Sequence, residues 1–272
     1  MVMMHLIMQP GMVYRYPIWT VALLMIGLSS LGTVLLELTV RRFVSARSRR
    51  EHNDATAAVF SVVGVTFAVL LAFVASVAWE NFNRAKAASY TEAALALDVD
   101  DALIGFEGPR ASAMHADLVG YLETVIGVEW PAQAEGQVID RASVDLDALN
   151  REALRLRPSG PAEVNLHALL LQSLVRLRDA RQDRMLAAQT TVPSIVWVVT
   201  VIGGALTIAF SSFLGIAKLG LHLAMSCTLA ISGVLVLVMI LALSNPFRGD
   251  FRVSMQPFER VLERVQLVGP AP

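Results

Sequence analysis

The chain has 272 residues, of which 55% are hydrophobic and only 17% are charged, and its mean hydropathy is +0.58. Soluble domains carry about 25% charged residues, so this composition excludes an ordinary soluble domain. The formal net charge is −1, and without a net-basic surface we expect no nucleic-acid partner.

Four long stretches of the chain carry no Asp, Glu, Lys or Arg. These stretches are residues 16–36, 55–79, 185–217 and 219–247. A helix needs about 20 apolar residues to cross a hydrocarbon core of about 30 Å, and each stretch is long enough. The sequence therefore predicts an all-α membrane protein with four transmembrane helices in a lipid bilayer. The predicted spans lie at about 18–39, 57–79, 193–213 and 221–243.

The charged residues gather between the second and third spans. Residues 80–192 hold 17 acidic and 11 basic side chains, a net charge of −6, whereas the rest of the chain has a net charge of +5. We therefore expect a two-plus-two arrangement, in which a solvated domain separates two pairs of spans. The predicted divisions are an N-terminal pair at 1–79, an extramembrane domain at 80–192, a C-terminal pair at 193–244 and a tail at 245–272.

The extramembrane domain has the sequence pattern of helices, because its apolar residues recur at helical spacing and strand-like alternation is absent. Pro131 is expected to end the second of these helices. The predicted helices cover 85–103, 111–128, 144–156 and 163–189. In the tail, one short amphipathic helix is expected, with an apolar face formed by Phe258, Val261, Leu262 and Val265.

The direction of insertion is not decided by the sequence. Arg15 precedes an apolar core without a small-residue cleavage site, so we expect a retained first span rather than a secretion signal. Five arginines in residues 41–54 favour a cytoplasmic first loop. Arg84, Lys86 and further basic residues beside the opposite ends of the spans favour the reverse orientation.

No pattern of catalytic or metal-binding residues occurs. The five histidines never fall three or four residues apart, and the chain has no phosphate-binding glycine loop and no nucleophile motif. Cys227 is the one cysteine, and we interpret it as a small buried hydrophobe. An acidic group beginning at Asp98 lacks the glycine of a calcium loop, which favours a solvated acidic face formed by Asp98, Asp100, Asp101 and Glu107. We expect no enzyme activity and no cofactor.

A stripe of small residues runs along the second span at intervals of four: Gly64, Ala68, Ala72 and Ser76. Small residues let helices approach closely in lipid, which favours a helix–helix contact within or between subunits. The alternative is that several copies of this span line a pore with the stripe. No charged residue lies near the middle of any span, which argues against a pump or a coupled transporter.

Four arginines precede the third span: Arg176, Arg178, Arg181 and Arg184. The favoured interpretation is a solvated helix face, on which Arg181 pairs with its neighbours Asp179 and Asp183. The alternative is a ring of arginines that attracts anions to the mouth of a pore.

Several short motifs occur in a characteristic order. They are His52-Asn53-Asp54, Leu71-Ala72-Phe73, Trp79-Glu80-Asn81-Phe82, Glu92-Ala93, Tyr121, Glu129-Trp130-Pro131, Arg181, Arg184, Pro193, Trp197 and Asn245-Pro246-Phe247-Arg248-Gly249. Their order and spacing, over about residues 15–265, resemble the bestrophin-like family of bacterial membrane proteins. The residues of these motifs have no assigned role.

This family is named for a distant similarity to bestrophins, which are pentameric anion channels whose second span lines the pore. The resemblance implies a homo-oligomer, by analogy a pentamer, in a bacterial inner membrane, with small anions as permeant partners. Two features depart from bestrophins. Only Asp250 lies near the position of their calcium-binding acidic run, and Phe67 and Phe73 lie off the small-residue stripe.

Two hypotheses follow for the function. The first is a homo-oligomeric passive channel, selective for anions, with the second span at its axis. The second is a membrane-anchored interaction or stress-sensing protein that acts through residues 80–192 without conducting ions.

Overall fold

A computed structural model of the chain describes Tyr14 and residues 16–268. Arg15, used above to judge the N-terminal segment, lies outside the described residues, as do residues 1–13 and 269–272 of the predicted N-terminal and tail segments.

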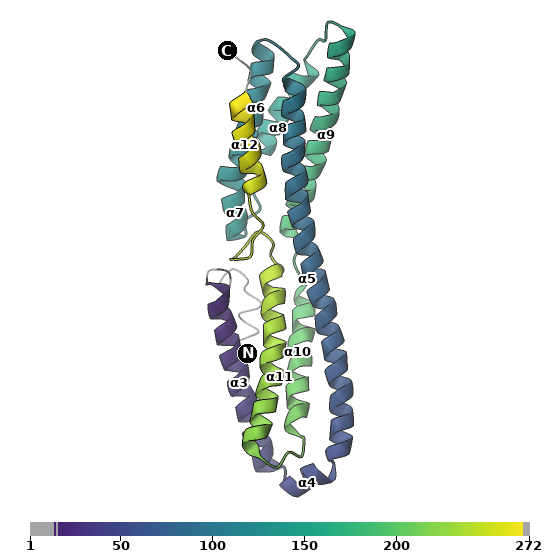
Figure 1. Ribbon diagram of the computed structural model, residues 1–272, viewed down its shortest axis with the longest axis vertical. Helices are drawn as coiled ribbons and strands as arrows, with labels where there is room; N and C mark the ends of the chain where they lie inside the picture. The colour runs from purple at the N-terminus through teal and green to yellow at the C-terminus, as the bar shows by residue number, and fades with distance from the viewer. Residues whose placement is uncertain (1–13, 15, 269–272) are drawn as a thin grey trace. The chain divides into compact units, whose positions relative to one another are not determined.

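The described residues form helices and no strands, so the all-α prediction is confirmed (Figure 1). The helices are α3 (Ile18–Phe43), α4 (Ala46–Glu51), α5 (Asn53–Leu103), α6 (Pro109–Thr124), the π-helix η1 (Val125–Glu129), α7 (Trp130–Glu135), α8 (Ser143–Leu154), α9 (Pro161–Gln189), α10 (Ser194–Ser212), α11 (Leu219–Leu243) and α12 (Gln256–Val268). Among the described residues, four helical segments are long and apolar enough to cross a membrane, and they include α3, α10, α11 and the first part of α5.

The chain divides into two compact units. The first, here called the membrane unit, contains α3, α4, α5 up to Glu80, α10 and α11. The second, here called the helical unit, contains the rest of α5, α6 to α9 and the segment from Asn245 that carries α12.

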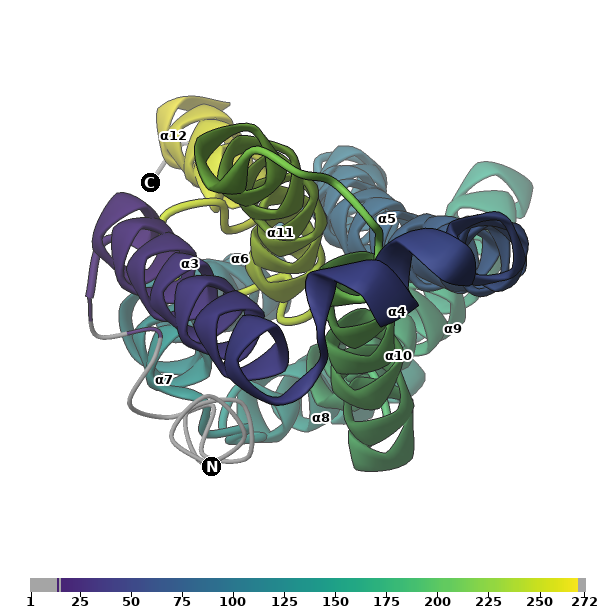
Figure 2. The same cartoon turned by 90° about the horizontal axis from the view of Figure 1, so that it is seen from below.

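In the membrane unit, α3 and α11 form an extensive helix pair. The short helix α4 connects α3 to α5, as the view along the helices shows (Figure 2). Ser45 begins α4, and its hydroxyl oxygen accepts a hydrogen bond from the Ser48 amide at 3.1 Å. The turn between α10 and α11 lies tightly against α4, because a Cβ atom at Gly215 would come within 2.9 Å of the Arg49 carbonyl oxygen.

The core of the helical unit is built from the inward faces of its helices. Alanines such as Ala93 and Ala96 give the second part of α5 a smooth buried face, against which the side chains of α6 and α9 pack. Larger apolar side chains fill the space between helices; among them are Met114, Leu118, Leu149, Leu170 and Leu177. The predicted apolar face of the tail is the buried face of α12, where Phe258 and Val265 have no exposed surface.

The chain remains helical past Pro131, so the prediction that this proline ends a helix is wrong. Proline has no amide hydrogen and cannot donate to the carbonyl four residues earlier. The structure accommodates this loss by widening one turn into the π-helix η1, in which the Trp130 amide donates to the Val125 carbonyl. The helix then continues as α7 and ends at Gly136, whose φ of +86° suits glycine.

Candidate functional site

Most of the charged motif residues of the helical unit meet in one buried ion-pair network. Its centre is Arg184 of α9, whose side chain is fully buried. The Nε and Nη2 atoms of Arg184 donate to the two carboxylate oxygens of Glu92 on α5, at 2.5 and 3.0 Å. Nη2 also donates to Glu129 Oε2 at 3.0 Å. One guanidinium therefore connects α9 to both α5 and η1.

Arg181 lies one helical turn earlier and completes the network. Its Nη1 and Nη2 atoms donate to the two oxygens of Glu129 at 3.0 and 2.6 Å, a bidentate pair. Nη2 also donates to Asp140 at 2.6 Å. Glu129 Oε1 accepts two more hydrogen bonds, from the amides of Arg141 and Ala142, each at 2.8 Å. The two arginines thus balance the two fully buried carboxylates, and half-exposed Asp140 adds a third negative charge.

The network favours the charged form of Glu129 and the neutral form of Tyr121. Burial raises the pKa of Glu129, but the hydrogen bonds and positive charge of Arg181 outweigh this effect and leave the pKa below its ordinary value. Burial and the neighbouring Glu92 carboxylate raise the pKa of Tyr121 well above its ordinary value. Tyr121 therefore stays protonated and donates its hydroxyl hydrogen to Glu92 at 2.6 Å.

An aromatic cluster covers the network on one side. The Trp130 ring lies edge-on to Phe247 with 5.3 Å between centroids, and it is 5.5 Å from the ring of Phe258. The guanidinium of Arg184 lies 5.7 Å from the Trp130 centroid. Glu129 is the last residue of η1 and Trp130 is the first of α7. The Glu-Trp-Pro motif therefore supplies a carboxylate of the network, an aromatic ring of the cluster and the proline that follows the widened turn. The ion pairs connect α9 to α5 and η1, and the aromatic packing joins α7 to α12.

The expectation that Arg181 pairs with its chain neighbours on a solvated face is wrong. Both Arg181 and Arg184 are buried, and their partners come from residues 41 to 92 positions away in the chain. The same burial excludes these two arginines from an exposed ring at a pore mouth. The expected acidic face is also interrupted, because Asp100 is buried and lies 3.4 Å from His115.

Other motif residues lie at helix ends or in loops. Asn53 Oδ1 accepts a hydrogen bond from the Gly215 amide at 2.8 Å, which ties the start of α5 to the α10–α11 turn. Pro193 lies directly before α10. The Pro246 carbonyl accepts from the Val253 amide at 2.7 Å and closes a loop in which Gly249 has a φ of +74°. Three more motif residues are exposed: Asp54, Trp79 and Glu80.

The small-residue stripe of α5 lies largely uncovered. Ala68, Ala72 and Ser76 are exposed, and Gly64 is half-buried. At Ala72 and Ser76 the stripe is therefore not buried against another helix of the same chain, whereas Gly64 and Ala68 face a cavity between α3, α5, α10 and α11.

A second charged cluster, which the sequence-based predictions missed, lies in the membrane unit. Glu37 of α3 is fully buried, and its Oε1 atom lies 2.6 Å from Arg41 Nε and 2.8 Å from His222 Nδ1. Arg49 of α4 approaches the same oxygen at 3.7 Å. His222 Nε2 lies 2.9 Å from the Ser211 carbonyl. A carbonyl oxygen only accepts hydrogen bonds, so Nε2 is the donor in this contact. Arg41 Nη2 also lies 3.2 Å from His222 Nδ1.

A signal for this cluster was present in the sequence. His222 interrupts an otherwise apolar run, and Glu37 directly follows another. A polar residue within a span marks a site of interest. Within the described part of the chain, no group of three or more His, Cys, Asp or Glu side chains gathers in the manner of a metal site.

Together these features define a class of protein: an all-α membrane protein with four spans and a helical region between the second and third. Residues 27–258 match the sequence model of the Bestrophin-like domain. Because this match covers most of the chain, the protein belongs to the Bestrophin-like family, and the resemblance drawn from its motifs is confirmed. A comparison with curated protein sequences gives no match.

Solved structures share this fold. Two crystal structures of variants of a bacterial bestrophin homologue from Klebsiella pneumoniae are similar to the chain. One has a TM-score of 0.71 at 15% identity and covers 92% of this chain and 98% of its own. The other has a TM-score of 0.67 at 14% identity and covers 91% of this chain and 100% of its own. A crystal structure described as a membrane protein has a TM-score of 0.67 at 15% identity, with coverage of 90% and 99%.

Proposed function

We propose that the protein is a homo-oligomeric passive ion channel, in which residues 57–79 of α5 from each copy surround a central axis and small anions pass along it. Membership of the Bestrophin-like family and the similarity to a bacterial bestrophin homologue support this proposal. By analogy with bestrophins, the proposed assembly is a pentamer in a bacterial inner membrane.

The observation that carries the proposal is the bare face of α5. Val62, Val65 and Val69 are each about two-thirds exposed, at 67%, 65% and 64%. The opposite face packs on the chain through Leu71 and Val74.

The residue types on this bare face differ from those on the outer face of α3. Exposed α3 positions carry large leucines, such as Leu23, Leu31 and Leu35. The bare face of α5 combines valines with Ala72 and Ser76, and its large side chain is Phe73, which is 68% exposed. Small residues at exposed positions are typical of helix approach in a membrane, so the bare face suits other copies of α5 better than lipid.

The charges near this face favour passive flow of anions. Residues 57–79 carry no ionisable side chain of Asp, Glu, Lys or Arg, so the proposed pathway has no group for coupling transport to protons or other ions. Arg42, Arg47 and Arg50 are exposed in the connection that leads into α5, and they outnumber the exposed Glu51 and Asp54. In a ring of copies, these arginines give the entrance a positive potential.

The first test is the mass of the detergent-extracted particle by native mass spectrometry. Five copies of 29.5 kDa have a mass of about 148 kDa. The particle is then reconstituted in vesicles that contain a chloride-sensitive dye, and chloride entry is followed after an imposed gradient. The proposal expects an oligomer and chloride entry well above that of protein-free vesicles.

Ala72→Leu tests the role of the α5 face, with Ala224→Leu as its matched control. Both alanines are exposed on membrane-spanning helices, but only Ala72 lies on the bare face of α5. We expect Ala72→Leu to abolish flux or assembly and Ala224→Leu to leave both unchanged. A stable monomer or dimer, or full flux in Ala72→Leu, contradicts the axial pore. That result favours the interaction or sensing role of residues 80–192, which predicts capture of a specific partner without permeation.

A further inference from the structure

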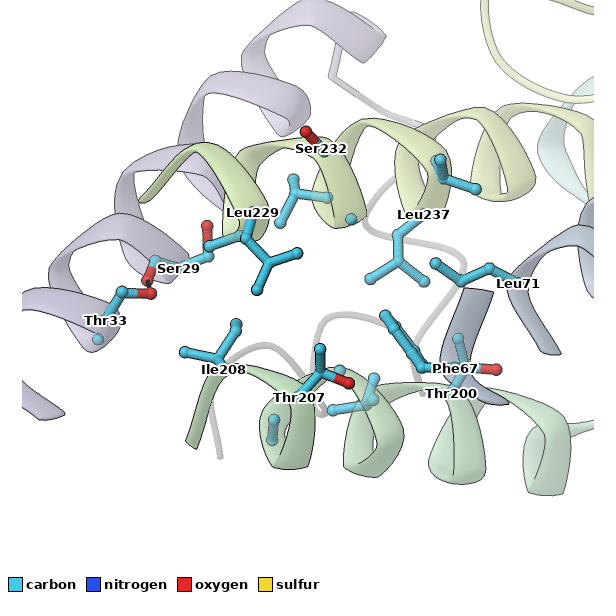
Figure 3. Close-up of a pocket in the computed structure, with 18 of the residues that line it drawn as sticks. Ser29, Thr33, Phe67, Leu71, Thr200, Thr207, Ile208, Leu229, Ser232 and Leu237 are labelled. Carbon is cyan, nitrogen blue, oxygen red and sulfur yellow. Dashed lines mark hydrogen bonds between the residues drawn. The ribbon is translucent and has the colours of Figure 1, made fainter. Parts of the chain in front are cut away.

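A cavity of about 650 Å³ lies within the membrane unit, between α3, α5, α10 and α11 (Figure 3). The lining residues fall within 28–36, 64–71, 200–208 and 229–237. Each of these segments is the middle part of its membrane-spanning helix. The cavity therefore lies at the depth of the hydrocarbon core, where acyl chains are the solvent.

The cavity exists because each of its four walls carries a glycine: Gly32, Gly64, Gly204 and Gly233. A Cβ atom added at Gly32 or Gly64 would meet no other atom within 4 Å. On the α10 side, the Phe67 ring packs directly against the glycine backbone, 3.1 Å from a Cβ built at Gly204. The glycines thus leave open space on two walls and seat an aromatic ring against a third.

The polar atoms of the lining are already occupied. The hydroxyls of Thr33, Thr200 and Thr207 donate to carbonyl oxygens of their own helices at 2.8, 2.6 and 2.8 Å. Ser29 and Ser232 do the same at 3.1 and 2.8 Å. No lining residue is ionisable. A polar ligand would find no free donor, and water would find no group that needs a partner.

We propose that this cavity is a binding site for one acyl chain of a membrane lipid. An apolar protein cavity of about 150 Å³ stays dry and binds benzene, and this cavity is about four times larger, which suits a chain of lipid length. Leaving it empty would deprive the lining of dispersion contacts. The surrounding lipid supplies acyl chains, and an acyl chain binds without polar contacts. The inference does not depend on ion conduction.

The test uses vesicles of phosphatidylethanolamine and phosphatidylglycerol with a trace of phosphatidylcholine that carries a diazirine in the middle of one acyl chain. After illumination, the labelled residues of the full-length protein are mapped by mass spectrometry. We expect the lining residues Val201 and Leu229 to be labelled more strongly than the outward-facing residues Leu23 and Leu206.

Gly32→Leu fills the cavity, and Gly27→Leu is its matched control. Both glycines lie on α3 with open space around the added Cβ, but only Gly32 lines the cavity. We expect Gly32→Leu to lower labelling of the lining about fivefold, which corresponds to about 1 kcal/mol of lost binding. Gly27→Leu should leave the labelling unchanged. Ala205→Leu, which fills the cavity from α10, gives a second measurement if Gly32→Leu does not fold.

Three results would overturn the proposal. In the first, the lining is labelled no more than the outward-facing residues. In the second, Gly32→Leu and Gly27→Leu lower the labelling equally. In the third, the lining stays unlabelled while a photoreactive residue placed at Leu229 crosslinks to a second copy of the chain, which identifies the neighbouring subunit as the occupant.

Discussion

Replacing Arg184 with methionine removes a fully buried guanidinium and keeps most of the side-chain volume. Glu92 then loses both of its hydrogen bonds from Arg184 and keeps the Tyr121 hydroxyl and a more distant Arg181 Nη1 at 3.7 Å. Glu129 keeps its bidentate pair with Arg181. The main consequence is one poorly compensated carboxylate in the core of the helical unit.

Breaking a buried ion pair by removing one partner costs about 3–5 kcal/mol. For a unit of this size, 1 kcal/mol shifts the melting temperature by about 3–4 °C. We therefore expect Arg184→Met to lower the melting temperature of the helical unit by about 10–20 °C. Adding Glu92→Gln removes the stranded charge and should recover about 1–3 kcal/mol as a coupling energy.

Trp130 reports on this unfolding, because it is the tryptophan of the helical unit, whereas Trp19, Trp79 and Trp197 belong to the membrane unit. Its fluorescence is measured on heating in a background where the other three are phenylalanine. Arg178→Met is the matched control, since Arg178 lies on the same helix and makes an exposed pair with Asp147. Such pairs contribute about 0–1 kcal/mol. Equal melting temperatures for Arg184→Met and Arg178→Met would refute the assignment of a stabilising buried network.

Three further outcomes are expected. Because Arg181 lowers the pKa of Glu129 in the folded state, the ion pair stabilises the fold above about pH 4.3, the ordinary pKa of a glutamate. This stabilisation is lost as the pH falls through the lower pKa of the folded state. Trp130 melts between pH 7 and pH 3 should show this acid loss, and Glu129→Gln should show a smaller one. Glu37→Gln leaves buried Arg49 without a carboxylate and should destabilise the membrane unit by about 3 kcal/mol. The control Glu51→Gln, at the exposed pair with Arg47, should cost less than about 1 kcal/mol. Equal shifts of the melting temperature in detergent would argue against a stabilising role of the Glu37 cluster. Gly136→Ala should cost about 1–3 kcal/mol, because φ is +86° and the new Cβ lies 2.6 Å from the Arg248 guanidinium carbon. Gly120→Ala, within α6 and with open space, should instead stabilise by about 0.5–1 kcal/mol in the same melts.

The sequence alone determined the fold class and the number of spans. Whether a segment enters lipid depends on the sum of its residue hydropathies, which is a local property of the chain. The charge-free runs therefore marked all four membrane helices. The ordered motifs also identified the family before any contact was known.

Only the tertiary structure decided which charges meet. Asp179 and Asp183 are the nearest acids to Arg181 along the chain, yet its partners are Glu129 and Asp140 from other elements. Glu37 and His222 lie at distant points of the sequence and touch because α3 packs along α11. Ion pairs and cavities depend on which helix faces come together, and that information lies in the packing of side chains rather than in the composition of any one segment.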